Sequence, residues 1–468
     1  MMLRRLSLPT VTADRRHTQV VTAVGICVAL LAFSLVVFPH TASAPSAAPT
    51  SQAQESVAPE PTPVASRATA ESDVFRLAAV KAPLPSPIPT RTPPPTPAAI
   101  LLPPGAQEVA SRIDQTIESA IEEGQFPGAV VLIAYDGRIV KLSAYGYSYL
   151  YQDADTRLQN PIPMQTDTIF DLASVTKTFT AVAVMRLVEQ GKLELDTPAA
   201  RYLPEFAANG KQDITLRQLL THTSGLPAGF TGDKPRSTPE ELMQVLYAQE
   251  LAAPPGQRYI YSDLGLITLG KIVEKVSGVT LDRFVEQQIT GPLDLHDTTY
   301  NPPASWRYRI AATECQPPEK RGTLRGEVHD GNAWVLGGVA GHAGLFSTAR
   351  DLARFGQMML NGGEVDGVRI LKPETVKLMT HPQGAAVPTE NVGLVWELNE
   401  DWYMGDLAAR TTFGHTGYTG TSIVVSPEQK LVVVLLTNRL HPRDQHTNLA
   451  GVRSSVASLA MQLAAGLR

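Results

Sequence analysis

A proline-rich stretch near the N-terminus restricts, more than any other feature, how this chain can fold. Residues 45–104 hold 15 prolines in 60 positions, and alanine, serine and threonine fill much of the remainder. Such a composition gives extended, polyproline-like spacers without internal hydrogen bonds, so it cannot pack a core. We therefore expect residues 41–104 to form a disordered tether and the globular part of the chain to occupy residues 105–468.

An uncharged apolar stretch at residues 20–38 precedes this tether and follows four arginines. We expect residues 1–18 to be a cytoplasmic basic segment and residues 19–40 to be a membrane anchor or signal segment, because arginines before a span favour the cytoplasmic side. A signal-peptide core is usually roughly 7–15 residues, so this longer stretch favours a retained anchor. Cleavage after Ala44 would instead secrete the protein, and both outcomes export the domain that follows.

The charge balance and the cysteine count exclude two classes of protein. The 40 Lys and Arg residues against 45 Asp and Glu residues give a formal net charge of −5, so no basic field exists to hold nucleic acid. Two cysteines, Cys27 and Cys315, cannot make a disulfide framework.

Strand signals lie at both ends of the globular part. Residues 128–135 and 138–145 are rich in β-branched side chains and flank Asp136-Gly137, a strong hairpin signal. Near the other end, residues 421–426 and 431–437 flank a four-residue turn, and residues 450–467 show helical apolar spacing.

The middle of the chain, from residue 174 to about residue 378, is mostly helical in pattern. The clearest expected helices are residues 216–220, 239–248, 264–276 and 349–360. Together these signals predict an α+β fold: an antiparallel sheet built from both chain ends, flanked by helices, with a large helical insertion.

Ser174 and Lys177 open an apolar helix that we expect to stop at Gly191. Residues three apart lie on one helix face, so the lysine amine is placed beside the serine hydroxyl. A partly desolvated amine with a lowered pKa could accept the serine proton. The alternative is a capping serine beside a solvent-facing lysine.

Two further motifs follow in the chain. Tyr261 and Asp263 lie where a loop enters a helix, and a phenol there can act as acid or base if nearby Lys177 lowers its pKa. The alternative is a core tyrosine and a capping aspartate. The segment 414–418 (GHTGY) has glycines that let a substrate approach a strand closely, although an ordinary hairpin is also consistent with it.

With these residues the chain resembles the penicillin-recognising serine hydrolases, within the class C β-lactamase-related group that includes low-molecular-mass penicillin-binding D,D-peptidases and esterases. The resemblance covers about residues 105–468. It rests on the motifs Ser174-x-x-Lys177, Tyr261-x-Asp263 and His415-Thr416-Gly417 in family order, and residues 221–226 and 341–348 support it. It implies a β-lactamase/transpeptidase-like fold and no cofactor.

The resemblance also implies a role for each motif. Ser174 attacks a carbonyl, Lys177 and Tyr261 shuttle its proton, and an acyl-enzyme forms and is hydrolysed. The backbone N–H groups of Ser174 and Tyr418 hold the oxyanion. The substrate is bound by Asp263, His415, Thr416, Gly417 and Tyr418, with Thr416 holding a substrate carboxylate or amide along the strand.

Two positions depart from the family pattern. His415 stands where lysine is commonest, so a permanent cation becomes a group that is mostly neutral at pH 7. Asp263 stands where asparagine is more usual, and its charge could keep Lys177 protonated. Both changes favour esterase or peptidase activity over β-lactam turnover. If His415 binds a substrate anion, rates should fall as pH rises through about 6.5.

A metal site at His329, Asp330 and His342 is conceivable, but ligand-spacing signatures are lacking and loop-ordering hydrogen bonds suffice, so we expect no metal. The sequence thus predicts a membrane-tethered, extracytoplasmic serine hydrolase acting on a small-molecule or peptidoglycan-derived ester, D-amino-acid peptide or β-lactam. The main alternative is a non-catalytic cell-wall binding module. A sensor of wall damage is a third possibility.

Overall fold

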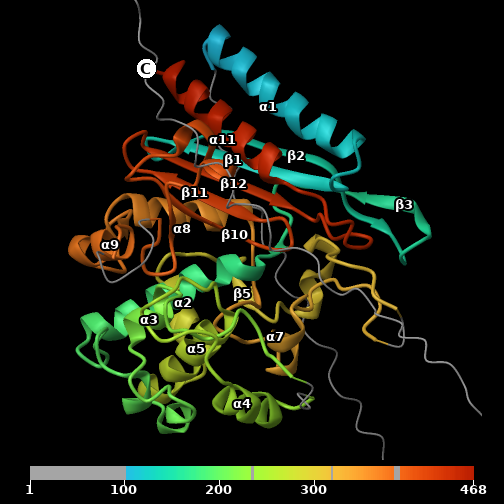
Figure 1. The fold of residues 1–468 in the computed structure, drawn as a ribbon. Helices are drawn as coiled ribbons and strands as arrows, with labels where there is room; N and C mark the ends of the chain where they lie inside the picture. The colour runs from blue at the N-terminus through green and yellow to red at the C-terminus, as the bar shows by residue number, and fades with distance from the viewer. Residues whose placement is uncertain (1–101, 233–236, 318–319, 384–390) are drawn as a thin grey trace, which may run out of the picture. The chain divides into compact units, whose positions relative to one another are not determined.

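The computed structural model of the protein describes residues 102–468, apart from 233–236, 318–319 and 384–390 (Figure 1). The expected anchor at residues 19–40 and all but the end of the expected tether at residues 41–104 lie outside this part of the chain. Within the described residues, no helix combines the length and the apolar character needed to span a bilayer.

A seven-stranded antiparallel sheet forms the centre of the domain, in the order β3-β2-β1-β12-β11-β10-β9. The strands β1 and β12 at its centre come from opposite ends of the domain. They pair from Ala129 opposite Thr437 to Tyr135 opposite Leu431. This confirms the sheet predicted from both chain ends. The strands are β1 (Gly128–Tyr135), β2 (Arg138–Tyr151), β3 (Arg157–Pro163), β9 (Glu397–Leu398), β10 (Phe413–Thr416), β11 (Ser422–Ser426) and β12 (Leu431–Thr437).

The hairpin between β1 and β2 turns at Asp136 and Gly137, which both have positive φ, 48° and 76°. Two successive positive φ values match the right-handed twist of the flanking strands, and glycine adopts such a value without strain. The hairpin expected at this dipeptide is therefore confirmed.

Helices cover both faces of the sheet (Figure 1). Side chains alternate along β1, so Val131 and its neighbours at every second position pack with α1 (Pro104–Glu122) and α11 (Ala450–Ala465). The intervening side chains, such as Val130 and Leu132, face the opposite way and join the larger core of the helical region. Because both faces are covered, the strand is apolar at nearly every position instead of alternating with polar residues.

The predicted insertion is a helical region joined to the sheet through α8. Its helices are α2 (Thr176–Glu189), α3 (Leu216–Leu220), α4 (Pro239–Ala248), α5 (Asp263–Ser277), α6 (Leu281–Val285), α7 (Gly331–Val335), α8 (Ala349–Leu360) and α9 (Pro373–Met379), and α10 (Asp401–Met404) follows β9. Short strands accompany them: β4 (Phe170–Asp171), β5 (Thr299–Tyr300), β6 (Leu345–Ser347), β7 (Glu364–Val365) and β8 (Val368–Arg369). Three of the four helices expected in this region have the predicted bounds, and α5 is one residue longer at each end.

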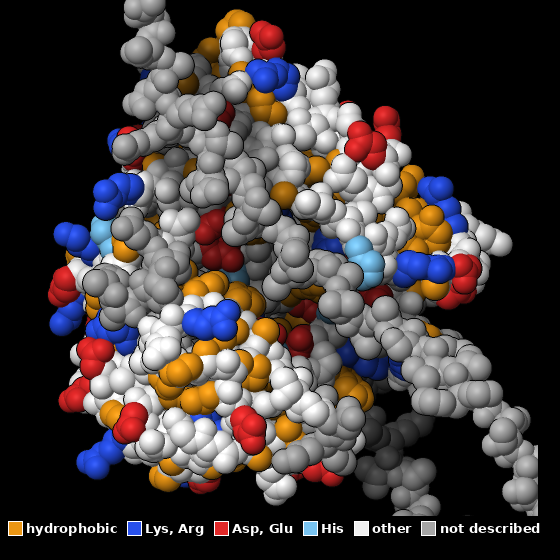
Figure 2. Space-filling model, in the orientation of Figure 1, with side chains coloured by type: hydrophobic (Ala, Val, Ile, Leu, Met, Phe, Trp, Pro, Cys, Tyr) orange, Lys and Arg blue, Asp and Glu red, His pale blue; other side chains and the backbone are white. Residues whose placement is uncertain are grey.

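The displayed surface carries charges of both signs. Lys and Arg side chains are interspersed with Asp and Glu side chains across the face shown in Figure 2. This mixed distribution agrees with the small net charge.

Candidate active site

Ser174 lies in a single 3-10 turn, Ala173–Val175, that leads directly into α2. Ala173 has a φ of +45°, an unusual value for a residue with a side chain, and its N–H donates to Asp171 at 2.8 Å. The serine is therefore held at a sharp turn between a short strand and a helix. Such a turn presents the hydroxyl at the helix N-terminus, where a developing negative charge is favoured.

Lys177 is adjacent to the serine, as the spacing predicts. Its Nζ donates to Ser174 Oγ at 2.8 Å and to the carbonyl of His342 at 3.2 Å, and its side chain is fully buried. The alternative of a solvent-facing lysine is therefore wrong. A buried ammonium needs a compensating negative group, and Asp263 provides one at 2.8 Å.

The second motif meets the first at the start of α5. Asp263 is the first residue of that helix and Ser262 precedes it as the N-cap, so the aspartate faces Lys177 and does not cap the helix. The ring of Tyr261 lies over the lysine, 4.9 Å from Nζ to the ring centroid. Hydroxyl, amine, carboxylate and phenol thus share one site.

The third motif is part of β10. His415 pairs with Ile423 of β11, while β9 pairs only with Phe413 and Gly414. Among the described strands, the other edge of β10 is therefore unpaired at His415 and Thr416, which are followed by Gly417. A Cβ on Gly417 would lie 2.4 Å from the carbonyl of Leu172, so the glycine lets this strand end pack against the turn that carries the serine.

The protonation states differ from the prediction. Burial disfavours the ammonium of Lys177, but Tyr261 and Asp263 outweigh burial and raise its pKa above the usual value. Burial likewise raises the pKa of Tyr261, although Lys177 acts in the opposite direction. The expectation of a lowered pKa is wrong for each residue, because Tyr261 and Asp263 outweigh burial at the lysine and burial dominates at the phenol. The raised pKa of Lys177 agrees with the separate expectation that the charge of Asp263 keeps the lysine protonated. At pH 7 the pair therefore rests as ammonium and phenol.

His415 also differs from its predicted behaviour. It is 1% exposed, and burial together with Lys177 lowers its pKa to about 3. Its Nδ1 lies 2.8 Å from the carbonyl of Thr416, which can only accept, so the proton is on Nδ1 and Nε2 has a lone pair. The histidine is therefore neutral throughout the physiological range, and the expected loss of rate through about pH 6.5 does not arise from its titration.

Sequence reasoning gave His222 only a supporting place, within residues 221–226. Its ring stacks on Tyr261 at a centroid distance of 4.6 Å, and its Nδ1 accepts from the N–H of Ser262 at 3.0 Å. Burial and Lys177 lower its pKa to about 3. His222 therefore acts as a neutral positioning residue that fixes the tyrosine ring.

Glu397 was missed entirely. It lies on β9 opposite Gly414, and burial raises its pKa to about 7, with Tyr403 and Arg453 acting in the opposite direction. No short motif marks this residue, because its position depends on pairing between two strands that are 16 residues apart. Glu397 is therefore a carboxyl group beside the third motif whose pKa lies close to neutral pH.

The backbone around the predicted oxyanion donor is fixed by two arginines. Arg453 donates to the carbonyls of Gly417 and Thr421, at 3.1 and 3.0 Å, and Arg439 donates to the carbonyl of Tyr418 at 2.7 Å. The ring of Tyr418 is 54% exposed and its hydroxyl donates to Asp444. Its side chain is therefore half exposed, while its carbonyl is fixed by Arg439.

The three residues considered for a metal do not converge on one point. His342 contacts Asp330 at 2.8 Å, whereas His329 contacts Glu314 at 3.1 Å. Asp330 also caps α7 by accepting from the N–H of Ala333. Within the part of the chain that the structure describes, no cluster of His, Cys, Asp and Glu has the arrangement of a metal site.

Fold and site together are those of a serine hydrolase, with a serine, a lysine and a tyrosine brought together at one helix start. A sequence model of the family described as Beta-lactamase matches residues 113–457. The chain belongs to the β-lactamase family, and the predicted resemblance, fold class and enzyme class are confirmed.

Two of the similar proteins carry the names of an amidase and of a carboxypeptidase. The chain is 39% identical over 361 residues to a protein of Bacillus subtilis (strain 168) named N-acetylmuramyl-L-alanine amidase, which covers 70% of this chain and 81% of the relative. It is 36% identical over 370 residues to an Escherichia coli (strain K12) protein provisionally named D-alanyl-D-alanine carboxypeptidase, with coverage of 71% and 83%.

Solved structures with the same fold include the hydrolase EstCE1, described as having promiscuous acyltransferase activity. It superimposes with a TM-score of 0.59 at 26% identity and covers 75% of this chain and 99% of its own. A penicillin-binding protein homologue from Caulobacter crescentus gives a TM-score of 0.61 at 24% identity, with coverage of 77% and 98%. The second likeness concerns the fold alone.

Proposed function

We propose that this serine hydrolase works through an acyl-enzyme on Ser174 and cleaves ester or amide bonds in cell-wall-derived substrates. The observation that carries the proposal is the set of contacts around Lys177, which lies 2.8 Å from both the serine hydroxyl and Asp263, beneath the ring of Tyr261. A nucleophile in contact with a group that can relay its proton is the arrangement that acyl transfer requires.

The proton pathway runs through the Lys177 and Tyr261 pair. The pair rests as ammonium and phenol, so one of these protons first leaves to solvent. As Ser174 Oγ bonds to the substrate carbonyl carbon, its proton passes to the member of the pair that has lost its proton, and the leaving nitrogen or oxygen then takes a proton from the same pair. Water hydrolyses the acyl-enzyme by the reverse sequence. Backbone N–H groups of Ser174 and Tyr418 are the proposed oxyanion donors, and loss of one such donor typically costs roughly 100-fold to 1000-fold in rate.

The third motif supports a substrate without a carboxylate next to the cleaved bond. His415 is neutral, and the nearest arginines, Arg439 and Arg453, are already bound to backbone carbonyls. A free terminal carboxylate, as in a D-alanyl-D-alanine peptide or a penicillin, therefore finds no uncommitted cation among these residues. We favour an amide such as the muramyl–L-alanine bond, the substrate class in the name of the Bacillus subtilis relative.

The location of the enzyme follows from the sequence alone. We propose that residues 20–38 anchor the chain, or direct its export, and that residues 41–104 hold the catalytic domain away from the membrane. Such a tether suits an enzyme whose substrate lies in the cell wall.

A substrate panel tests the proposed function. Residues 105–468 and the Ser174→Ala variant are incubated with p-nitrophenyl acetate, muramyl dipeptide and a D-alanyl-D-alanine tripeptide. We expect the wild-type domain to cleave the ester and the muramyl amide more efficiently than the tripeptide, and the variant to lose at least about 1000-fold of each activity. Turnover that persists in the variant would contradict the role of Ser174, and a preference for the tripeptide would contradict the substrate class.

A further inference from the structure

We propose that a hollow whose walls are hydrogen-bonded to Asp171, three residues before Ser174, is a subsite for an uncharged sugar ring of the substrate. The hollow has a volume of about 600 Å³, which lies within the range of roughly 300–1,000 Å³ typical of small-molecule sites. It is lined by Glu314, Arg321, His329, Trp334, Tyr418 and Asp444, among others. The inference rests on the proposed function and deepens it, because it names the part of the substrate that this enzyme recognises.

Both walls of the hollow are attached to the turn that carries the nucleophile. The N–H of His329 donates to Asp171 at 2.7 Å, and the hydroxyl of Thr419, next to Tyr418, donates to the carbonyl of the same aspartate at 2.7 Å. Asp171 comes three residues before Ser174. The walls that would hold a ligand are therefore fixed to the segment that carries the serine.

Aromatic rings form the walls. Trp334 is 47% exposed and Tyr418 is 54% exposed, which is unusual for side chains that gain so much from burial. The rings of His329 and Tyr418 lie 6.0 Å apart, and Arg321 stacks over Trp334 at 5.0 Å. Exposed aromatic rings that are held in place suit the apolar C–H face of a pyranose ring, which buries area at little cost in entropy.

Three of the four Lys, Arg, Asp and Glu residues that line the hollow, Glu314, Arg321 and Asp444, already have partners, and Lys320 is the fourth. His329 contacts Glu314 at 3.1 Å, Arg439 contacts Asp444 at 3.4 Å, and the third pair joins Arg321 to Glu327 at 2.7 Å. A charged ligand would have to compete with these partners, whereas a neutral one can use the remaining lone pairs of the carboxylates. Sugar hydroxyl groups and an acetamido N–H are donors of that kind.

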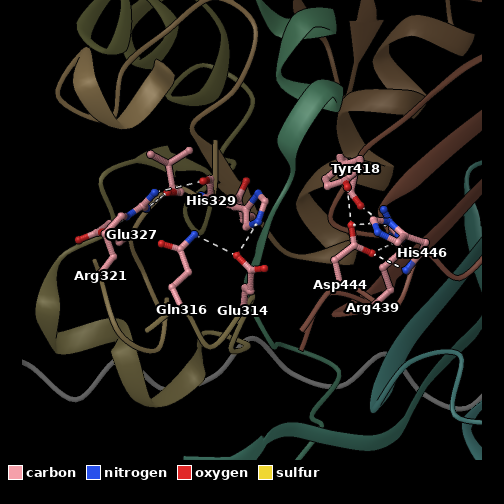
Figure 3. Close-up of polar contacts among 11 residues, drawn as sticks. Glu314, Gln316, Arg321, Glu327, His329, Tyr418, Arg439, Asp444 and His446 are labelled. Atoms are coloured by element: carbon pink, nitrogen blue, oxygen red, sulfur yellow. Dashed lines mark hydrogen bonds and ion pairs between the residues drawn. The ribbon is translucent and has the colours of Figure 1, made fainter. Parts of the chain in front are cut away.

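The polar groups of the hollow are also fixed in orientation before a ligand arrives. Figure 3 shows two hydrogen-bonded groups, one around Glu314 and one around Asp444. Gln316 donates to Glu314 at 2.9 Å, and the hydroxyl of Tyr418 donates to Asp444. Because these bonds exist without a ligand, little side-chain freedom is lost on binding.

The test compares two amides that differ only in the sugar. Muramyl dipeptide carries the ring, and lactoyl-L-alanyl-D-isoglutamine keeps the lactyl–alanine amide without it. Release of the dipeptide is followed by mass spectrometry for the wild-type domain, Trp334→Ala and the matched control Trp402→Ala, in which an exposed tryptophan outside the hollow is removed. We expect the wild-type kcat/KM ratio of the two amides to exceed about 30, to fall toward 1 in Trp334→Ala, and to be unchanged in Trp402→Ala.

A second measurement tests binding directly, and it applies even if the enzyme cleaves neither amide. The uncharged methyl amide of N-acetylmuramic acid is titrated into the Ser174→Ala variant, and tryptophan fluorescence is followed with and without the Trp334→Ala change. A saturable signal that requires Trp334 supports the subsite, and its absence overturns it. Equal cleavage of the two amides by the wild-type domain also overturns the subsite, while leaving the proposed function intact. Cleavage that survives loss of Ser174 contradicts the proposed function instead.

Discussion

Replacement of Asp263 by asparagine should make the enzyme faster at neutral pH. The carboxylate of Asp263 lies 2.8 Å from the Nζ of Lys177 and holds the lysine as an ammonium, which cannot accept the serine proton. Asparagine has a similar shape but no charge. The pKa of Lys177 should therefore fall, and a larger fraction of the enzyme should carry the neutral amine.

The size of the effect follows from the geometry. Two unit charges 2.8 Å apart interact by about 6 kcal/mol at an effective dielectric constant of about 20. The Asp263 side chain is 31% exposed, so solvent screening leaves about half of this, which corresponds to about 2 pKa units. At pH values below the pKa of Lys177, the neutral amine then becomes about 100-fold more abundant. Because this amine is a weaker base, the rate of proton transfer to each neutral amine falls about 10-fold. The net acceleration at pH 7 is about 10-fold.

The assay is pre-steady-state acylation by p-nitrophenyl acetate between pH 5 and 10. In the wild-type domain the rate should rise with pH across this range, because the pKa values of both Lys177 and Tyr261 are raised above their ordinary values. In Asp263→Asn the same rise in acylation rate should be shifted about 2 pH units lower. The control Asp196→Asn, which removes a surface carboxylate, should leave the pH dependence unchanged. An alkaline limb that does not move, or a slower variant at pH 7, would refute this reasoning.

Three further predictions concern stability and packing. Burial raises the pKa of Glu397 to about 7, so between about pH 4.5 and pH 7 the folded state retains a proton that the unfolded state has released. The free energy of unfolding therefore falls as pH rises through this range. In urea unfolding, Glu397→Gln should be more stable than wild type by about 3 kcal/mol at pH 8 and equally stable at pH 4. Gly417→Ala places a Cβ 2.4 Å from the Leu172 carbonyl, so thermal unfolding should show a loss of about 1–3 kcal/mol and ester hydrolysis should fall at least about 10-fold. Phe179→Ala removes a buried ring that stacks on Phe355 at 3.9 Å and should cost about 3–5 kcal/mol by urea unfolding, and a loss below about 1 kcal/mol would contradict this packing.

Local signals predicted much of the fold. The β1–β2 hairpin was found because Asp136-Gly137 adopts a turn that few other dipeptides allow. Helix α8 was found because its apolar side chains fall on one face and Thr348 caps its start. The expected membrane anchor and tether, which lie outside the described residues, remain predictions.

Elements that depend on distant partners were missed. Helix α1 has few strongly apolar residues and stays in place because it packs against α11, more than 300 residues away in the sequence. The two-residue strand β9 exists only through its pairing with β10. Short strands of this kind leave no periodic pattern to detect.

In the candidate site too, the features set by local sequence were predicted, and those set by distant partners were not. Motif spacing was sufficient to bring Ser174 and Lys177 together, because a single helical turn fixes their separation. The pKa values of the site were predicted only in part. The effect of Asp263 on Lys177 was expected from the motif, but the burial of Lys177 and His415 depends on the three-dimensional arrangement.

The covalent state of Ser174 tests the central claim most directly. The wild-type domain is mixed with a fluorophosphonate or a slowly hydrolysed ester, and the modified protein is digested and mapped by mass spectrometry. We expect one adduct per domain on Ser174, a much slower adduct in Lys177→Ala, and none on that residue in Ser174→Ala. A stoichiometric adduct on another residue, or catalytic turnover without any adduct, would contradict this account.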